Sequence, residues 1–348
     1  MREHASLAGE LEQERHPLSR TFLRDHGYAA AAIDDYYAIL GRFRDRFHPA
    51  DQQAPDPREL YVEAPDGARI FVQEFIPEHP QAVVIGQPGN NCQSDLYYPL
   101  ADHLYPKGIG LVAVDNRGHG RSGPGRGKFN KPALMFPVYD ALVERFAASG
   151  VPVHVLGESL GTTMFASYIA SGSAASRKVA SAIFLVPPYK LRRQQLLDRI
   201  KWLAKLLLWL GRAFTLDRPV LAFKPDLRPT YFPEYHEIDA SDIIRAPKST
   251  LVHLLCVLKQ IERFHRDIKA ITIPLLVLAG TGDKDLDPAG AEQLSRESNS
   301  VNLALHMYEN ADHSLMFDRN SQGSYDMILR WVQNGWRVRH SNTSTPNI

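Results

Sequence analysis

The chain is 348 residues long, which is enough for one large domain or two small ones. Hydrophobic residues make up 44% of it and predict a sizeable core, while a net charge of +1 argues against general affinity for nucleic acids. Its two cysteines, Cys92 and Cys256, form neither a disulfide framework nor a zinc-ligand pattern and fit a reducing compartment. Because the N-terminus is polar and no uninterrupted apolar run reaches about 18 residues, we expect a cytoplasmic protein without a signal peptide or membrane-spanning helix.

The N-terminal region, residues 1–57, is rich in charged residues. Its helical periodicity is clearest from Tyr28 to Phe47, and three prolines between positions 49 and 57 then interrupt the pattern. We therefore predict a helical extension followed by a linker.

Short apolar runs typical of β-strands recur from residue 58 onward. The first two, Leu60–Ala64 and Arg69–Ile76, flank Pro65-Asp66-Gly67, which is a hairpin-turn sequence. Helical segments separate most of the later runs, which are 82–86, 110–115, 153–157, 182–186, 274–280 and 301–308. Buried strands that alternate with helices indicate a parallel sheet. We therefore predict an α/β fold whose sheet has eight strands, mostly parallel, with helices on both faces.

The segment 188–272 interrupts this alternation. A structureless loop of that length is implausible in a compact domain, so we predict a helical lid there. The core then comprises residues 58–187 and 273–338, followed by a loose tail at 339–348. The lid is rich in leucine and tryptophan, and at helical spacing Trp202, Leu206 and Trp209 would share one face. That face either packs on the core, lines an acyl-binding pocket or touches a membrane.

The most informative motif is Gly157-Glu158-Ser159-Leu160-Gly161, which links an apolar strand to a helix lined with small residues. This arrangement predicts a nucleophile elbow, in which a strained turn exposes the serine hydroxyl at a helix N-terminus. Gly157 and Gly161 would let the strand and helix backbones approach closely. The alternative interpretation is a glycine-rich turn that holds an inert serine.

A serine nucleophile needs a base, and the base needs an orienting acid. His313 follows the last predicted strand and is the candidate base. Asp283 follows the strand before it and is the preferred acid. Asp285 and Asp287 compete with it; we interpret Asp285 as a solvated loop charge and Asp287, which precedes Pro288, as a helix N-cap.

An oxyanion hole would complete this machinery. The backbone N–H of Leu160 follows the nucleophile directly and is the first expected donor. The second is the backbone N–H of Asn90, in the loop Gln87-Pro88-Gly89-Asn90-Asn91 after the third strand. A plain Pro-Gly-Asn turn is the alternative interpretation of this loop.

A further motif follows the fourth predicted strand: Asp115-Asn116-Arg117-Gly118-His119-Gly120-Arg121-Ser122-Gly123. Together with the motifs above, it makes the chain similar to α/β-hydrolase fold serine hydrolases of the lysophospholipase and monoacylglycerol lipase-like group. The resemblance covers residues 59–338. It implies the α/β-hydrolase fold, a Ser-His-Asp triad, a helical cap, no metal and no cofactor. We interpret the quoted stretch as structural, with Arg117 and Ser122 bracing the catalytic loops. Pro88-Gly89 departs from the His-Gly that relatives usually carry in the oxyanion loop.

We therefore expect a serine hydrolase that cleaves a small acyl ester through an acyl-serine intermediate. A lipid-like ester is favoured by the leucine-rich lid, which could also make a peripheral membrane contact. Thioester cleavage, amide cleavage and acyl transfer remain open on the same machinery, because a fold does not decide the substrate. The competing class is a hydrolase scaffold that binds a ligand without turnover.

Overall fold

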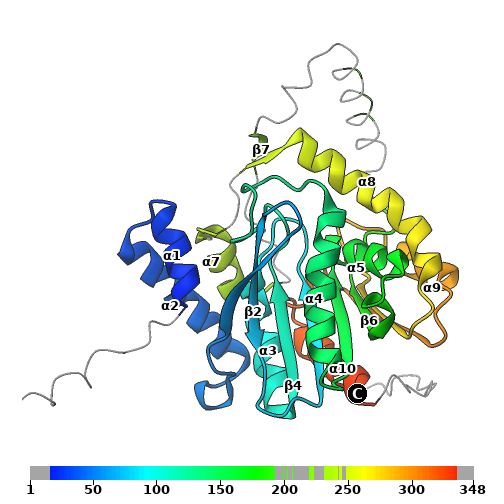
Figure 1. Cartoon of the computed structure of the whole chain (residues 1–348), viewed down its shortest axis with the longest axis horizontal. Coiled ribbons are helices and arrows are strands. Elements are labelled where there is room, and N and C mark those ends of the chain that lie inside the picture. Colours follow the sequence, from blue (N-terminus) through cyan, green and yellow to red (C-terminus); the bar gives the residue numbers. More distant parts are fainter. Residues whose placement is uncertain are drawn as a thin grey trace, which may run out of the picture.

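The computed structural model describes residues 16–192, 199, 202, 206, 219–222, 231–241, 243–244 and 248–334. Eight strands form the main sheet in the order β1-β2-β4-β3-β5-β6-β9-β10 (Figure 1). Within this sheet the β1–β2 and β2–β4 pairs are antiparallel and the other pairs are parallel. The predicted eight-stranded, mostly parallel sheet is therefore confirmed. Its strands are β1 Arg58–Glu63, β2 Arg69–Phe75, β3 Ala82–Gln87, β4 Ile109–Val114, β5 Val153–Glu158, β6 Val179–Leu185, β9 Leu275–Gly280 and β10 Leu303–Tyr308.

Helices cover both faces of this sheet (Figure 1). They are α1 Pro17–Asp25, α2 Ala30–Phe47, α3 Tyr98–Leu104, α4 Phe136–Ala147, α5 Leu160–Ser171, α7 Pro233–Ser241, α8 Leu251–Asp267, α9 Ala289–Glu297 and α10 Ser321–Gln333. Short 3₁₀ turns occupy Ala50–Gln52, Ser94–Tyr97, Tyr105–Lys107, Pro132–Met135, Ser176–Lys178 and Ile268–Ala270.

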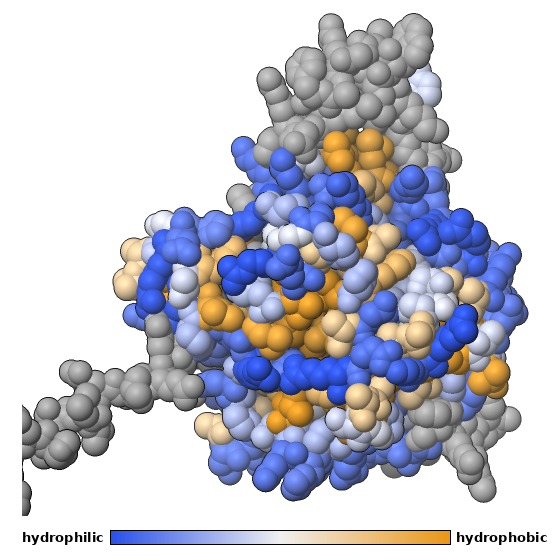
Figure 2. Space-filling view, in the orientation of Figure 1, coloured by the Kyte–Doolittle hydropathy of each residue, from blue (hydrophilic) through white to orange (hydrophobic). Residues whose placement is uncertain are grey.

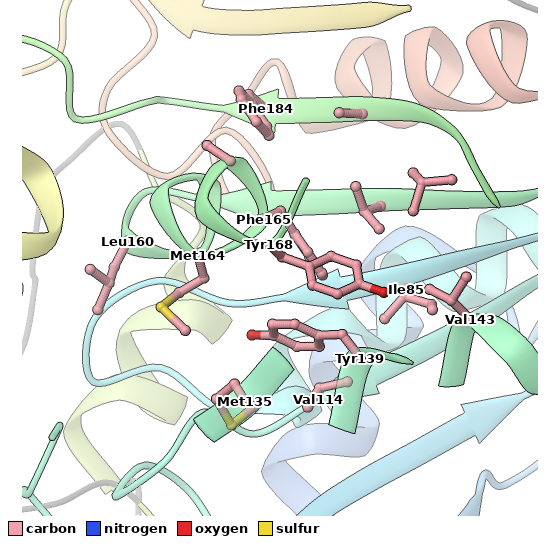
Figure 3. Packing of buried hydrophobic residues seen from close by; sticks show 14 of the residues in the cluster. Ile85, Val114, Met135, Tyr139, Val143, Leu160, Met164, Phe165, Tyr168 and Phe184 are labelled. Atoms are coloured by element: carbon pink, nitrogen blue, oxygen red, sulfur yellow. The ribbon is translucent and has the colours of Figure 1, made fainter. Parts of the chain in front are cut away.

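The sheet contributes to two hydrophobic cores because successive strand residues point to its opposite faces. Along β9, Val277 belongs to the core with α4, α5 and α8, whereas Leu276 and Leu278 belong to the core with α2, α3 and α10. In the first core, α5 packs against α4 through ring contacts such as Tyr139 with Phe165, whose centroids are 4.9 Å apart (Figure 3). Burial on both faces explains the near-continuous apolar character of the strands.

The N-terminal extension packs on the main domain through polar as well as apolar contacts. Its α2 covers most of the predicted helical stretch. The buried guanidinium of Arg44 donates to both carboxylate oxygens of Asp102 on α3, at 2.7 and 3.0 Å. Tyr36 donates its hydroxyl hydrogen to Asp95 at 2.6 Å. Because both contacts are buried, α2 is fixed to the core rather than lying loosely on its surface.

The segment 188–272 contains strands as well as the predicted helices. Besides α7 and α8, its described part includes β7 Pro219–Ala222 and β8 Lys248–Thr250, which pair antiparallel in a small separate sheet. These two short runs lack the alternating pattern that would reveal a strand. The predicted tail, residues 339–348, lies outside the described residues. No helix in the described part of the chain is long and apolar enough to cross a membrane.

The surface of the molecule carries both polar and apolar residues. On the face drawn in Figure 2, hydrophilic residues dominate the margins and apolar residues gather near the middle. Exposed apolar atoms are usual on folded domains, so this distribution alone assigns no binding surface.

Candidate active site

Three candidate catalytic side chains follow three parallel strands of one sheet. Ser159 follows β5, Asp283 lies in the loop after β9, and His313 lies in the loop after β10. In the order β5-β6-β9-β10, these strands run parallel, so their carboxyl ends meet at one edge. The topology therefore brings residues that are far apart in the sequence to one place.

A continuous hydrogen-bonded chain links these side chains. His313 Nδ1 lies 2.8 Å from Asp283 Oδ2, and His313 Nε2 lies 3.0 Å from Ser159 Oγ. An ionised carboxylate can only accept, so Nδ1 carries the hydrogen and donates to Asp283. In the neutral imidazole, Nε2 is then left as an acceptor for the Ser159 hydroxyl. This is the tautomer that a general base needs.

Ser159 occupies the strained turn expected of an elbow. Its backbone has φ 47° and ψ −113°, outside the regions that non-glycine residues usually adopt. The crossing of strand and helix leaves no room for a side chain at the flanking glycines. A Cβ on Gly157 would lie 2.5 Å from backbone atoms of Gly161 and Thr162, and one on Gly161 would lie 2.0 Å from the Gln87 carbonyl oxygen. Glycine is therefore required at both positions by close approach.

Asp283 is the carboxylate that reaches His313, and its other oxygen is also occupied. Asp283 Oδ1 accepts the backbone N–H groups of Asp285 and Leu286, at 2.8 and 2.9 Å. Asp287 instead pairs with Lys190 at 2.6 Å and accepts the backbone N–H of Ala289. The residue at the N-cap position of α9 is Pro288, so the prediction that Asp287 is the N-cap is wrong by one residue: Asp287 precedes the N-cap.

Two buried carboxylates influence the charge on His313. Burial lowers the pKa of His313, but the hydrogen bond and charge of Asp283 outweigh it, with Asp285 and Glu158 adding, so the pKa is raised. Burial raises the pKa of Glu158 to about 7, while the charge of His313 opposes that shift. Glu158 directly precedes the serine and is only 4% exposed. The site therefore holds a titratable carboxyl group that sequence reasoning did not single out.

We expect Glu158→Gln to move the acid limb of the kcat/KM profile to lower pH. His313 must be neutral to accept a proton, so activity rises with pH through its pKa. Glu158, whose own pKa is about 7, raises the pKa of His313 to the extent that it is ionised, and glutamine removes this charge while keeping the shape. The pH profile of kcat/KM measures the effect, with Glu144→Gln as the control because the Glu144 side chain is 43% exposed and pairs with Lys178. An acid limb that stays or moves upward contradicts this assignment.

The loop after β3 runs directly beside the nucleophile. A Cβ on Gly89 would lie 3.3 Å from Ser159 Cβ. Gln87, at the end of β3, accepts a hydrogen bond from the Tyr139 hydroxyl at 2.7 Å. Leu160 is the first residue of α5, so no carbonyl four residues earlier in the helix can accept its N–H. Both segments that we expected to supply oxyanion donors thus border Ser159.

The side chain of Asn90 is held by a histidine that sequence reasoning did not select. The backbone N–H of Phe129 donates to His253 Nδ1 at 3.1 Å, so Nε2 carries the hydrogen and donates to Asn90 Oδ1 at 2.8 Å. Burial lowers the pKa of His253 to about 3, which keeps it neutral at ordinary pH. His119 Nε2 lies 3.4 Å from the same oxygen. No local signal reveals this contact, because His253 and Asn90 are 163 residues apart.

Two residues of the glycine-rich stretch after β4, Arg117 and Ser122, brace the leading hairpin. Arg117 donates to both carboxylate oxygens of Asp66, which lies in the β1–β2 turn. Ser122 Oγ accepts the backbone N–H of Phe71 in β2 at 2.9 Å. Our expectation that Arg117 and Ser122 brace the catalytic loops is therefore wrong, because these two residues hold the β1–β2 hairpin instead. The contact with the site comes from His119 instead, through Asn90.

One group in the described part of the chain has the spacing of metal ligands, namely Asp283, Asp285 and His313. The hydrogen on His313 Nδ1 already occupies the position that a ligand lone pair would need. An ion could bind there only by displacing the proton that joins the imidazole to Asp283. The hydrogen bond between His313 and Asp283 therefore explains why these two side chains lie so close together.

The three candidate substrate-binding residues of the lid are only partly described. Trp202 and Leu206 are helical; Trp202 is 66% exposed and Leu206 is half-buried. Trp209 lies outside the described residues. The three positions remain candidates for an acyl-binding or membrane-facing surface.

Comparisons with known proteins agree with this architecture. The family profile described as serine aminopeptidase, S33 (Hydrolase_4) matches residues 78–320. The human monoglyceride lipase is 27% identical over 81% of this chain and 91% of its own, and the monkeypox virus monoglyceride lipase homolog is 26% identical over 72% and 88%. A soluble variant of the Saccharomyces cerevisiae monoglyceride lipase superposes with a TM-score of 0.71, at 19% identity over 84% of this chain and 99% of that one. The predicted α/β-hydrolase fold and monoacylglycerol lipase-like resemblance are confirmed.

Proposed function

The chain belongs to the serine aminopeptidase S33 family of α/β-hydrolases, and from this membership we propose that it cleaves a carboxylic ester through an acyl-serine intermediate. It is an ester-hydrolysing enzyme related to monoglyceride lipases. The observation that carries the proposed mechanism is the hydrogen-bonded chain from Asp283 through His313 to Ser159.

The reaction begins when His313 Nε2 takes the hydroxyl proton of Ser159 and Oγ attacks the ester carbonyl carbon. The tetrahedral intermediate collapses as the bond to the alcohol oxygen breaks, and His313 returns the proton to the departing alcohol. Water then attacks the acyl-enzyme with the same base, which releases the carboxylic acid and restores the serine. Asp283 holds the imidazole in the required tautomer and stabilises its cation.

The backbone N–H groups of Leu160 and Asn90 stabilise the oxyanion in this proposal. Two features support them: Leu160 begins α5, and the loop carrying Asn90 runs so close to Ser159 that a Cβ on Gly89 would lie 3.3 Å from the Ser159 Cβ. Removal of one such donor typically costs about 3–4 kcal/mol in the transition state. The hydrogen bond from His253 to the Asn90 side chain would hold this loop in place beside Ser159.

The substrate that we favour is a small lipid-like ester with one apolar acyl chain. The human and viral relatives are a monoglyceride lipase and its homolog, and the predicted lid is rich in leucine and tryptophan. An amide substrate is the second candidate, because the family profile carries the description of an aminopeptidase. Thioester cleavage, acyl transfer and ligand binding without turnover rank below these two, since neither the family description nor these two relatives point to them.

A matched substrate panel tests this proposal. The purified protein is assayed with a monoacylglycerol, an acyl thioester and an aminoacyl amide, and kcat/KM is compared. We expect the ester to be cleaved fastest. Faster amide cleavage would move the assignment to a peptidase, and no turnover of any substrate would favour a binding scaffold.

The lid is proposed to set the preference for acyl-chain length. If Leu206 lines the acyl pocket, we expect Leu206→Trp to shift the kcat/KM maximum toward shorter acyl chains, because the larger side chain would shorten the pocket. Overpacking a core can cost about 1–3 kcal/mol, so Tm is measured on the same samples. A lower Tm with an unchanged chain-length profile would contradict the claim that Leu206 lines the pocket, and would indicate that this residue packs in the core instead.

A peripheral membrane contact through the exposed Trp202 is the remaining part of this proposal. Aromatic side chains are favoured at membrane interfaces. Co-sedimentation with phosphatidylcholine vesicles tests it, and full recovery in the supernatant at moderate salt would remove it.

A further inference from the structure

The N-terminal extension lies outside the region that the family profile matches, yet one of its helices reaches toward the catalytic-histidine loop. The helices α2 and α7 lie side by side at one end of the molecule (Figure 1). Because Arg44 fixes α2 to α3 through buried hydrogen bonds, α2 presents a firm surface to α7. The segment 231–241, which contains α7, is therefore held from outside by the extension.

The contacts between α2 and this segment are aromatic and charged. The Phe47 ring meets the Phe232 ring edge-to-face, with centroids 5.3 Å apart. The Arg46 guanidinium lies 4.8 Å from the centroid of the same Phe232 ring. Two ion pairs join the helix surfaces, Arg42 with Glu237 at 2.7 Å and Arg46 with Glu234 at 3.5 Å.

Segment 231–241 also contacts the loop that follows His313. The Tyr235 ring stacks on Phe317 with centroids 4.4 Å apart, and the backbone N–H of Phe232 donates to the Phe317 carbonyl at 3.1 Å. Closest to the chemistry, the backbone N–H of Ser314 donates to the Tyr231 hydroxyl at 3.1 Å. Tyr231 is 3% exposed, so this hydrogen bond is shielded from water. It fixes the peptide group immediately after His313.

We propose that α2 is an intramolecular clamp that holds segment 231–241 on the catalytic-histidine loop, and that Tyr231 is a positioning residue for His313. This inference rests on the proposed function in that His313 is taken as the base. A displaced imidazole would lengthen the hydrogen bond to Ser159 Oγ, and small displacements of catalytic groups slow the chemical step. The clamp thus gives the extension a role in catalysis without contact with substrate.

The first test removes only the hydroxyl that Ser314 uses. We expect Tyr231→Phe to lower kcat about threefold to tenfold with KM unchanged, the range that one net hydrogen bond can supply. The rate of labelling of Ser159 by a fluorophosphonate should fall by the same factor, because labelling needs the same base. Tyr235→Phe is the matched control and should keep both rates. Wild-type rates in Tyr231→Phe, with Tm unchanged, overturn the positioning role.

The second test loosens the clamp from the extension. The double reversal Arg42→Glu with Arg46→Glu should speed amide hydrogen exchange about tenfold in 231–241 and in 313–318. Adding Glu234→Arg and Glu237→Arg restores the opposite charges and should restore the exchange rates. Unchanged exchange, or faster exchange confined to 231–241, overturns the clamp. Failure of wild-type protein to label at Ser159 would instead refute the proposed function, and the exchange measurement does not depend on that outcome.

Discussion

Ser159→Ala should lose about a million-fold in turnover, as happens when the nucleophile of a serine-histidine-aspartate triad is removed. Ser159 supplies the oxygen that forms the covalent bond, and its hydroxyl is the group that His313 Nε2 contacts at 3.0 Å. The assay compares the hydrolysis of a monoacylglycerol by the variant and the wild type at saturating substrate.

Ser171→Ala is the matched control for this substitution. Ser171 lies at the end of the same helix and bonds to the Tyr168 carbonyl, away from the sheet edge. We expect it to retain wild-type turnover. A Ser159→Ala protein that keeps even a tenth of wild-type turnover would show that another group is the nucleophile.

Asp283→Asn should lower turnover about ten-thousand-fold, the loss found when the triad acid becomes an amide. The new amide oxygen can still accept the N–H groups of Asp285 and Leu286, so its nitrogen would face His313. The imidazole would then have to accept at Nδ1 and donate at Nε2, and that tautomer cannot take the serine proton. Steady-state kinetics of the purified variant measure the loss.

Asp285→Asn and Asp287→Asn distinguish the acid from its neighbours. Asp285 acts on His313 only through its charge, so we expect a small effect on turnover. Asp287→Asn removes the charge that pairs with Lys190 but leaves an amide oxygen that can still accept the Ala289 N–H, so it should cost less than about 1 kcal/mol of stability and little activity. A ranking in which either variant is the most damaging would reassign the acid.

The sheet and the candidate catalytic side chains could be anticipated because their signals are local. Strands buried on both faces read as continuous apolar runs, and a parallel sheet gathers the loops after its strands at one edge. Ser159, Asp283 and His313 each follow such a run, so their positions in the sequence predicted their meeting. The elbow could be read from two glycines at the spacing that close backbone approach requires.

The contacts that support the site could not be anticipated because they depend on tertiary structure. His253 and Asn90 are 163 residues apart in the sequence, and Tyr231 and Ser314 are 83 residues apart, so only the folded chain brings each pair together. Arg117 lies in a motif that suggests a structural role, but no sequence pattern identifies Asp66 as its partner. Likewise, β7 and β8 are too short to show a strand period.

The central claim, that Ser159 is a nucleophile activated by His313, is tested most directly by covalent labelling. The wild-type protein is treated with a fluorophosphonate, digested, and the modified peptide is identified by mass spectrometry. We predict a single adduct on Ser159 that is lost in Ser159→Ala and strongly slowed in His313→Gln. An adduct on another residue, or ester hydrolysis that continues in fully labelled protein, would contradict the account.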